Sequence, residues 1–323
     1  MLEVVVDDAY EKYIACSSSR VTVFAGTRVA LIIDSGCGID TSIWPLAAVT
    51  SCVEAIERLL AAFDACVGRV PEPIRPYRGR ATRIEVAFLE GAAGLASHGV
   101  AGCAVGPAFI KDMVDSVSGV AGFSRVIMPH VLCYELCRNY IFPDEFTPRV
   151  DYCLYSSRAI GAPLSPSCWG WVNQGFVNVL GTLLLDELDD PQVGFSYHGH
   201  SREKFLADME AQLTRYVQDG HDWSTTFMHE RLLWDPSSSL DNVYSGILIN
   251  LWRAYGRGAF LTRFFLALND RPCISKGDAQ GARDNFAITM ARAARADLTV
   301  YFNSLRWPPL RLGGGTLDFS TTR

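Results

Sequence analysis

Tyr134-Glu135-Leu136-Cys137-Arg138 is the stretch of sequence that decides the fold. It lies in a segment from Val126 to Tyr140 whose apolar residues recur at helical spacing, which predicts a helix. Residues 134 and 138 of a helix lie one turn apart on the same face, and residue 135 lies beside them. We therefore expect a phenol, a carboxyl group and a guanidinium to gather at one place on this helix.

Two further segments extend the pattern. The first is Trp169-Gly170-Trp171-Val172-Asn173-Gln174-Gly175-Phe176-Val177, which leads into a predicted helix from Trp171 to Asp186. The second starts at Asp284-Asn285-Phe286, continues through Asp297-Leu298-Thr299 and ends at Arg306-Trp307-Pro308. Each is a weak signal singly, and the three together carry more weight.

The three segments resemble those of gluzincins, which are zincin-like metallopeptidases with an H-E-x-x-H helix, and in particular enhancin-type and mucin-cleaving peptidases. In that helix two histidines bind zinc and the glutamate polarises the attacking water. Here Glu135 matches the glutamate, but Tyr134 and Arg138 occupy the two histidine positions. The family's W-x-N-E-G-F-A segment provides the third ligand, and Gln174 stands where its glutamate would be. The resemblance therefore implies a degenerate member without the zinc ligands, and we predict no metal and no cofactor at this site.

The resemblance implies an α+β, zincin-like two-lobed fold. We expect an N-terminal lobe over residues 1–145, with a mixed sheet, helices and the altered helix. A mainly helical C-terminal lobe over 146–312 and a flexible tail over 313–323 would follow. A cleft would separate the lobes, roofed by an edge strand near residues 99–106.

In such a cleft the altered helix suggests metal-free acid/base chemistry. Glu135 would transfer a proton if burial raised its pKa, Tyr134 would donate a hydrogen bond to an oxyanion, and Arg138 would hold an anionic group. The predicted reactions are a cyclisation, isomerisation, elimination or hydrolysis of a small or peptide-like substrate. The residues that we expect to bind this substrate are Gln174, Asn173, Trp171, His98 and His130, with Trp169 as a further cleft wall.

Three alternatives stay open. The chain could be an inactive pseudo-peptidase that serves as a binding or scaffold protein and uses the same cleft. It could be a purely structural remnant, in which Arg138 pairs with Glu135 or another carboxylate and replaces the structural role of the lost zinc. It could also be a metal hydrolase with relocated ligands, because the imidazoles of His198 and His200 would face the same way on an extended segment. That segment reads better as a surface loop. Cys133 and Cys137 lie one helical turn apart and could together bind a metal. Packing of both thiols on a buried helix face is the simpler interpretation.

Composition limits the partners. The chain has 323 residues, 49% of them hydrophobic and 20% charged, which is typical of a folded protein with a large core. A formal charge of −6 without a basic stripe argues against nucleic acid or an anionic membrane as partner. No stretch has the roughly 18 apolar residues of a membrane span, and the N-terminus does not resemble a targeting signal. The ten cysteines have no framework spacing, so we expect reduced thiols and a cytoplasmic location.

Periodicity predicts the other elements. A hairpin is expected over 21–33 with its turn at Ala25-Gly26-Thr27, then a helix from Pro45 to about Cys66 and a strand from Arg83 to Leu89. A helix is expected over 107–117. After the helix at Trp171, the predicted C-terminal helices cover 201–217, 240–255, 259–268 and 279–303.

Overall fold

The computed structural model describes residues 2–7, 20–73, 84–92, 94–97, 99–119, 124–141, 171–226, 240–271 and 279–308. The chain divides into two compact units. The first unit comprises Met1–Ala65, Arg69–Ile141 and Leu180–Arg202, and the second comprises Cys66–Gly68, Phe142–Val179 and Glu203–Arg323. The sequence predicted one boundary near residue 145, whereas this division assigns residues 180–202 to the first unit.

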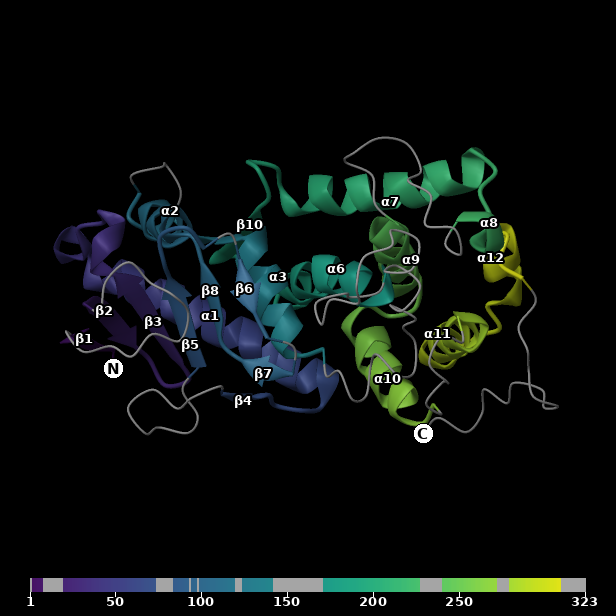
Figure 1. Ribbon diagram of the computed structural model, residues 1–323, viewed down its shortest axis with the longest axis horizontal. Coiled ribbons are helices and arrows are strands. Elements are labelled where there is room, and N and C mark those ends of the chain that lie inside the picture. Colours follow the sequence, from purple (N-terminus) through teal and green to yellow (C-terminus); the bar gives the residue numbers. More distant parts are fainter. Residues whose placement is uncertain are drawn as a thin grey trace, which may run out of the picture. The chain divides into compact units, whose positions relative to one another are not determined.

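A six-stranded mixed sheet forms the centre of the first unit (Figure 1). Its order is β1-β2-β3-β5-β8-β6, with β3, β5 and β8 parallel and the other pairs antiparallel. Valine and isoleucine side chains of its middle strands are buried, as expected for strands covered on both faces. The strands are β1 (Glu3–Asp7), β2 (Val21–Ala25), β3 (Val29–Asp34), β5 (Ile84–Phe88), β6 (Leu95–Ala96) and β8 (Cys103–Val105).

The predicted hairpin is confirmed, because β2 pairs antiparallel with β3. Helix α1 (Leu46–Val67) follows, after two single turns of 3₁₀ helix, η1 (Ser35–Cys37) and η2 (Thr41–Ile43). Glu57 of α1 accepts hydrogen bonds from the backbone N–H groups of Arg28 and Val29, at 2.6 and 3.2 Å. The helix is thereby tied to the start of β3.

The helix predicted from Val126 is shorter than expected. Residues Val126–Pro129 form strand β9, which pairs in parallel with β10 (Val193–Ser196), and α3 begins only at His130 (His130–Asn139). Val126 and Ile127 are β-branched residues that suit a strand, and proline disfavours helical backbone at the residue before it. Helix α2 (Pro107–Val117) has the predicted bounds, and the short strands β4 (Glu72–Pro73) and β7 (Val100–Ala101) pair with each other.

The second unit is helical in the part that the structure describes. Helix α6 begins in this unit and ends in the first, and α7 has all but its first residue here. Phe176 packs on Phe264 with ring centroids 4.8 Å apart, and Trp307 packs on Phe302 at 4.8 Å. The helices are α6 (Trp171–Glu187), α7 (Arg202–Gln218), α8 (Trp223–Thr226), α9 (Leu240–Ala254), α10 (Gly258–Asn269), α11 (Ala279–Ala294) and α12 (Thr299–Ser304).

The continuous helix predicted over 279–303 is wrong. It is broken between α11 and α12, where Arg295 adopts a φ of 54° and the Asp297 carboxylate accepts a hydrogen bond from the Thr299 N–H at 2.8 Å. The left-handed residue ends α11, and the carboxylate of Asp297, which precedes the N-cap Leu298, accepts from the first N–H of α12. None of the helices in the described ranges is long and apolar enough to cross a membrane.

Candidate functional site

Helix α3 carries the residues that the sequence singled out. Its side chains at Leu132 and Leu136 are buried, whereas Tyr134 and Arg138 are partly exposed. The predicted common face of Tyr134 and Arg138 is consistent with this pattern. Helix α6 packs closely against α3, because a Cβ added at Gly181 would lie 2.8 Å from the Cys133 carbonyl oxygen. A larger residue at 181 would push the two helices apart.

Glu135 and Arg138 form a largely buried ion pair. The Arg138 Nη1 donates to the Glu135 Oε2 at 3.1 Å, and Glu135 is only 3% exposed. Burial raises the pKa of the Glu135 carboxyl group, and the adjacent guanidinium partly opposes that rise. The charge on Glu135 also adds to the effect of burial in raising the pKa of the Cys103 thiol. Cys103 belongs to β8, so Glu135 is directed toward the sheet.

The Glu135 carboxyl group lies beneath the chain at Gly94. A Cβ added at Gly94 would lie 2.6 Å from Oε1, and Gly94 has a φ of 128°. That backbone conformation is favourable only for glycine. The strand at the sheet edge here is β6, directly after Gly94, rather than the predicted edge near residues 99–106. Residues 100–101 and 103–105 instead form β7 and β8, and β8 lies between β5 and β6.

Asn139 holds the loop before β8 against α3, a role that the sequence did not reveal. Its Oδ1 accepts from the Gly102 N–H at 3.0 Å, and its Nδ2 donates to the carbonyl oxygens of Ser97 and Gly102 at 3.0 and 3.1 Å. Asn139 is 0% exposed. One amide side chain thus binds three buried or partly buried backbone groups.

His130 is the first residue of α3. Its ring centroid is 4.9 Å from that of Tyr197, in an edge-on arrangement, and 6.1 Å from that of Tyr134. These rings form an aromatic cluster at the start of α3, and His130 and Tyr197 both line a cavity there. The sequence predicted His130 as a substrate-binding residue, and that role stays a prediction.

The other predicted binding residues fall elsewhere. Gln174 is half-buried on α6 in the second unit. The side chains of Asn173 and Trp171 lie outside the described residues, as do His98 and Trp169 as a whole. The predicted cleft between the lobes and the roles of these residues in it therefore stay predictions.

A buried polar cluster near Gln174 was missed by sequence reasoning. Asn178 donates to the Asp241 carboxylate at 2.8 Å and to the Asn242 amide oxygen at 3.2 Å. Burial raises the pKa of Asp241 to about 6, which hydrogen bonds only partly oppose. The backbone of Gly175 lies against Asp241, since an added Cβ would be 2.6 Å from its carbonyl oxygen. No sequence signal links Asn178 with Asp241, which follows it by 63 residues.

The residues at the expected zinc positions of α3 do not fit zinc. A guanidinium stays protonated and repels a cation, and Arg138 here serves as the counter-ion of Glu135. Tyrosine is not a usual zinc ligand either. Among the described residues, no group of three histidine, cysteine, aspartate or glutamate side chains could hold a metal ion.

The relocated-ligand hypothesis is not supported by the backbone at His198 and His200. Residues 197–200 form a tight turn, in which Tyr197 and His200 exchange backbone hydrogen bonds at 3.1 and 2.9 Å. His198 and Gly199 have φ values of 48° and 79°, so the segment is not extended and the two imidazoles do not share one face of a strand. The alternative prediction of a surface loop is confirmed, because both histidines are exposed.

Comparison with solved structures identifies the class of fold. A metallopeptidase from Bacteroides thetaiotaomicron superimposes with a TM-score of 0.53 and 11% identity, over 90% of this chain and 42% of that protein. A metallopeptidase in complex with Tn antigen gives a TM-score of 0.51 and 12% identity, over 88% of this chain and 44% of that protein. The fold is metallopeptidase-like. The chain spans less than half the length of either structure, no family model matches it, and no curated protein matches it in sequence.

Proposed function

We propose that this chain is a metallopeptidase-like protein that binds a small or peptide-like ligand and has no zinc-dependent hydrolytic activity at α3. The observation that carries the proposal is the Glu135–Arg138 ion pair. In a zinc peptidase the glutamate acts on a metal-bound water. Here a fixed guanidinium takes the cationic role next to that glutamate, and it cannot polarise a water as a metal would.

Accessibility supports binding over catalysis by Glu135. A general base must come within hydrogen-bonding distance of the proton it removes, or reach it through one water. The Glu135 carboxyl group is almost completely buried, engaged by Arg138 and approached closely by the Gly94 backbone. Tyr134 and Arg138 keep partly exposed side chains, so these two residues are the better candidates for contact with a ligand.

A second candidate is a metal-independent acid/base enzyme, the function first predicted from the sequence. The observation in its favour is the raised pKa of Glu135, since buried carboxyl groups with raised pKa values serve as acids and bases in active sites. On this hypothesis Glu135 transfers the proton, Tyr134 donates to an oxyanion and Arg138 orients an anionic group.

The Glu135→Gln variant separates the two candidates. If the ion pair is structural, the variant loses about 1 to 3 kcal/mol of unfolding free energy, because a buried charged hydrogen bond is removed. A metal-free active site predicts an unchanged or higher thermal midpoint, since catalytic groups are commonly placed at a cost in stability. Glu54→Gln on α1 is the matched control, because Glu54 is exposed and its replacement should have little effect.

The combination of Glu135→Gln with Arg138→Met completes the test. If the two side chains stabilise mainly each other, the double variant is more stable than the sum of the single losses predicts. Additive losses would contradict a coupled ion pair and leave the acid/base hypothesis as the better account.

A further inference from the structure

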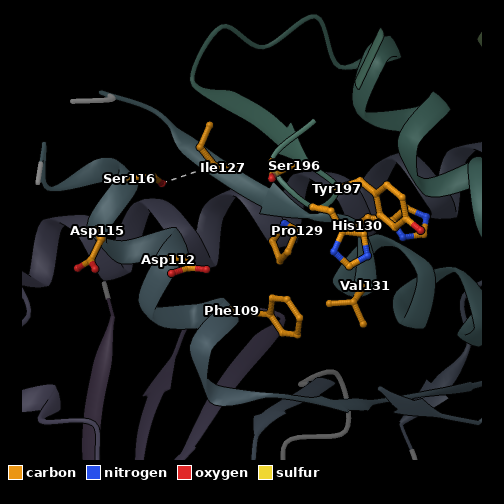
Figure 2. A pocket seen from close by; sticks show the side chains of 12 residues that line it. Phe109, Asp112, Asp115, Ser116, Ile127, Pro129, His130, Val131, Ser196 and Tyr197 are labelled. Atoms are coloured by element: carbon orange, nitrogen blue, oxygen red, sulfur yellow. Dashed lines mark hydrogen bonds between the residues drawn. The ribbon is translucent and has the colours of Figure 1, made fainter. Parts of the chain in front are cut away.

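A cavity of about 500 Å³ lies within the first unit, and neither Glu135 nor Arg138 lines it. Its walls come from one face of α2, from the end of β9 and the start of α3, and from the turn after β10 (Figure 2). The volume is in the range typical of sites for small organic ligands.

The walls of this cavity differ in chemistry. Phe109 and Val131 are apolar, and the rings of His130 and Tyr197 form its aromatic end. Figure 2 shows the Asp112 carboxylate directed from α2 toward the hollow, opposite Pro129. A ligand that fits these walls has an apolar or aromatic body and a polar group at its α2 end.

The charges define the polar group. Lys111 forms its ion pair with Asp115, at 2.5 Å, and interacts with Asp112 only through a weaker electrostatic effect that raises the lysine's pKa. Ser116 is already engaged, since it accepts from the Ile127 N–H at 3.0 Å and donates to the Met113 carbonyl at 2.6 Å. Asp112 is thus the charged group open to a ligand, and it calls for a cation.

The position of the carboxylate sets the orientation of the ligand. Asp112 and Phe109 lie one helical turn apart on α2 and both line the cavity. A cationic group is therefore placed next to the Asp112 carboxylate and within reach of the Phe109 ring. The apolar body then extends toward Tyr197.

We propose that this cavity is a binding site for a small organic cation, an amine or amidine with an aromatic or apolar body. Asp112 pairs with the cationic group, and Phe109, Val131 and Tyr197 contact the body. The proposal does not rest on the Glu135–Arg138 account, and either can fail without the other.

The test compares 4-fluorobenzamidine with 4-fluorobenzamide, which have nearly the same shape but differ in charge. Fluorine NMR titration with the full chain at neutral pH should show saturable binding of the amidine, with a dissociation constant of about millimolar for a ligand of this size. The amidine should bind at least about fivefold more tightly than the amide, the ratio expected for a partly exposed charge pair with an aromatic contact.

Variants locate the binding. Asp112→Asn should reduce the preference for the amidine by at least about threefold. Phe109→Leu should weaken binding of the amidine, because the ring that contacts the cation is lost. Glu54→Gln removes one carboxylate from an exposed position of α1 in the same unit and should change neither the affinity nor the preference.

Equal binding of amidine and amide, no saturable binding of either, or a preference that survives Asp112→Asn would each overturn the proposal. Thermal midpoints of the variants verify folding, since Asp112 is exposed and its replacement should not destabilise the protein.

Discussion

Replacement of Arg138 by methionine tests the ion pair most severely. Methionine keeps most of the length of the side chain and removes its charge, leaving Glu135 buried without its counter-ion. Removal of one partner of a buried pair generally costs about 3 to 5 kcal/mol. The carboxyl group can avoid part of that cost by taking up a proton.

Protonation of Glu135 sets an upper limit on the unfolding free energy that the Arg138→Met variant loses. For a carboxyl group with an ordinary pKa of 4.5, remaining protonated in the folded state at pH 7 costs about 3.4 kcal/mol, at about 1.36 kcal/mol per pH unit. The corresponding limit at pH 5 is about 0.7 kcal/mol. The wild-type pKa is already raised, so part of this penalty exists before the substitution. We therefore expect a loss of about 2 to 3 kcal/mol at pH 7 and less than about 1 kcal/mol at pH 5.

The sign of the pH dependence follows from the direction of the pKa shift. A carboxyl group whose folded pKa is raised favours the folded state at low pH and loses that contribution as the pH rises. Arg138→Met raises the pKa of Glu135 further, because it removes the guanidinium that opposes the effect of burial. The stability of the variant should therefore fall more steeply than that of the wild type between pH 5 and pH 7.

Urea unfolding at pH 5, 6 and 7 measures these differences. The matched control is Arg253→Met, which breaks an arginine–glutamate pair whose arginine side chain is 47% exposed, and should cost under about 1 kcal/mol at every pH. A loss for Arg138→Met that is equal at pH 5 and pH 7, or no larger than that of the control, would refute the reasoning.

Three further variants test other contacts of the two units. Asn139→Ala should lower the unfolding free energy by about 2 to 4 kcal/mol, because the Gly102 N–H and C=O lose their partner, and the hydrogen exchange of that amide should accelerate in the same sample. Gly94→Ala should cost about 1 to 3 kcal/mol through its positive φ and the approach to Glu135, as measured by the thermal midpoint, and an unchanged midpoint would show that Gly94 does not cover the carboxyl group. Asp241→Asn should abolish a stability loss of up to about 3 kcal/mol that the wild type undergoes between pH 4 and pH 6, because its pKa of about 6 lies above the ordinary 3.8, and a wild-type profile that is flat in this range would contradict the shift.

Local signals predicted part of the fold well. Helix α2 has its predicted bounds, because Pro107 stands at its first position, where the missing N–H is no loss. The hairpin of β2 and β3 turns at residues 26–28, within one residue of the predicted turn. These elements are decided by residues close to one another in the chain.

The failures involve partners distant in sequence. Strand β9 exists because it pairs with β10, some 67 residues later, and the apolar Val126-Ile127-Met128 run alone cannot be distinguished from the first turn of a helix. The break at Arg295 has no glycine or proline to announce it. In both cases a tertiary or conformational preference overrode the local pattern.

The candidate site shows the same difference between features set by nearby residues and features set by residues distant in sequence. Proximity of Glu135 and Arg138 follows from helical spacing, and their pairing was one of the alternatives that the sequence left open. The cover provided by Gly94, and the clamp of Asn139 on Ser97 and Gly102, depend on backbone groups about 40 residues away. No side-chain pattern reports contacts of that kind.

The most direct test of the central claim is the zinc content of the purified, untagged wild-type chain. Elemental mass spectrometry is performed after incubation with excess zinc and dialysis. Replacement of the ligand positions by Tyr134 and Arg138 predicts zinc far below a stoichiometric amount. Stoichiometric zinc that survives dialysis would contradict the account, and its loss in a Tyr134→Phe variant would place the metal at α3.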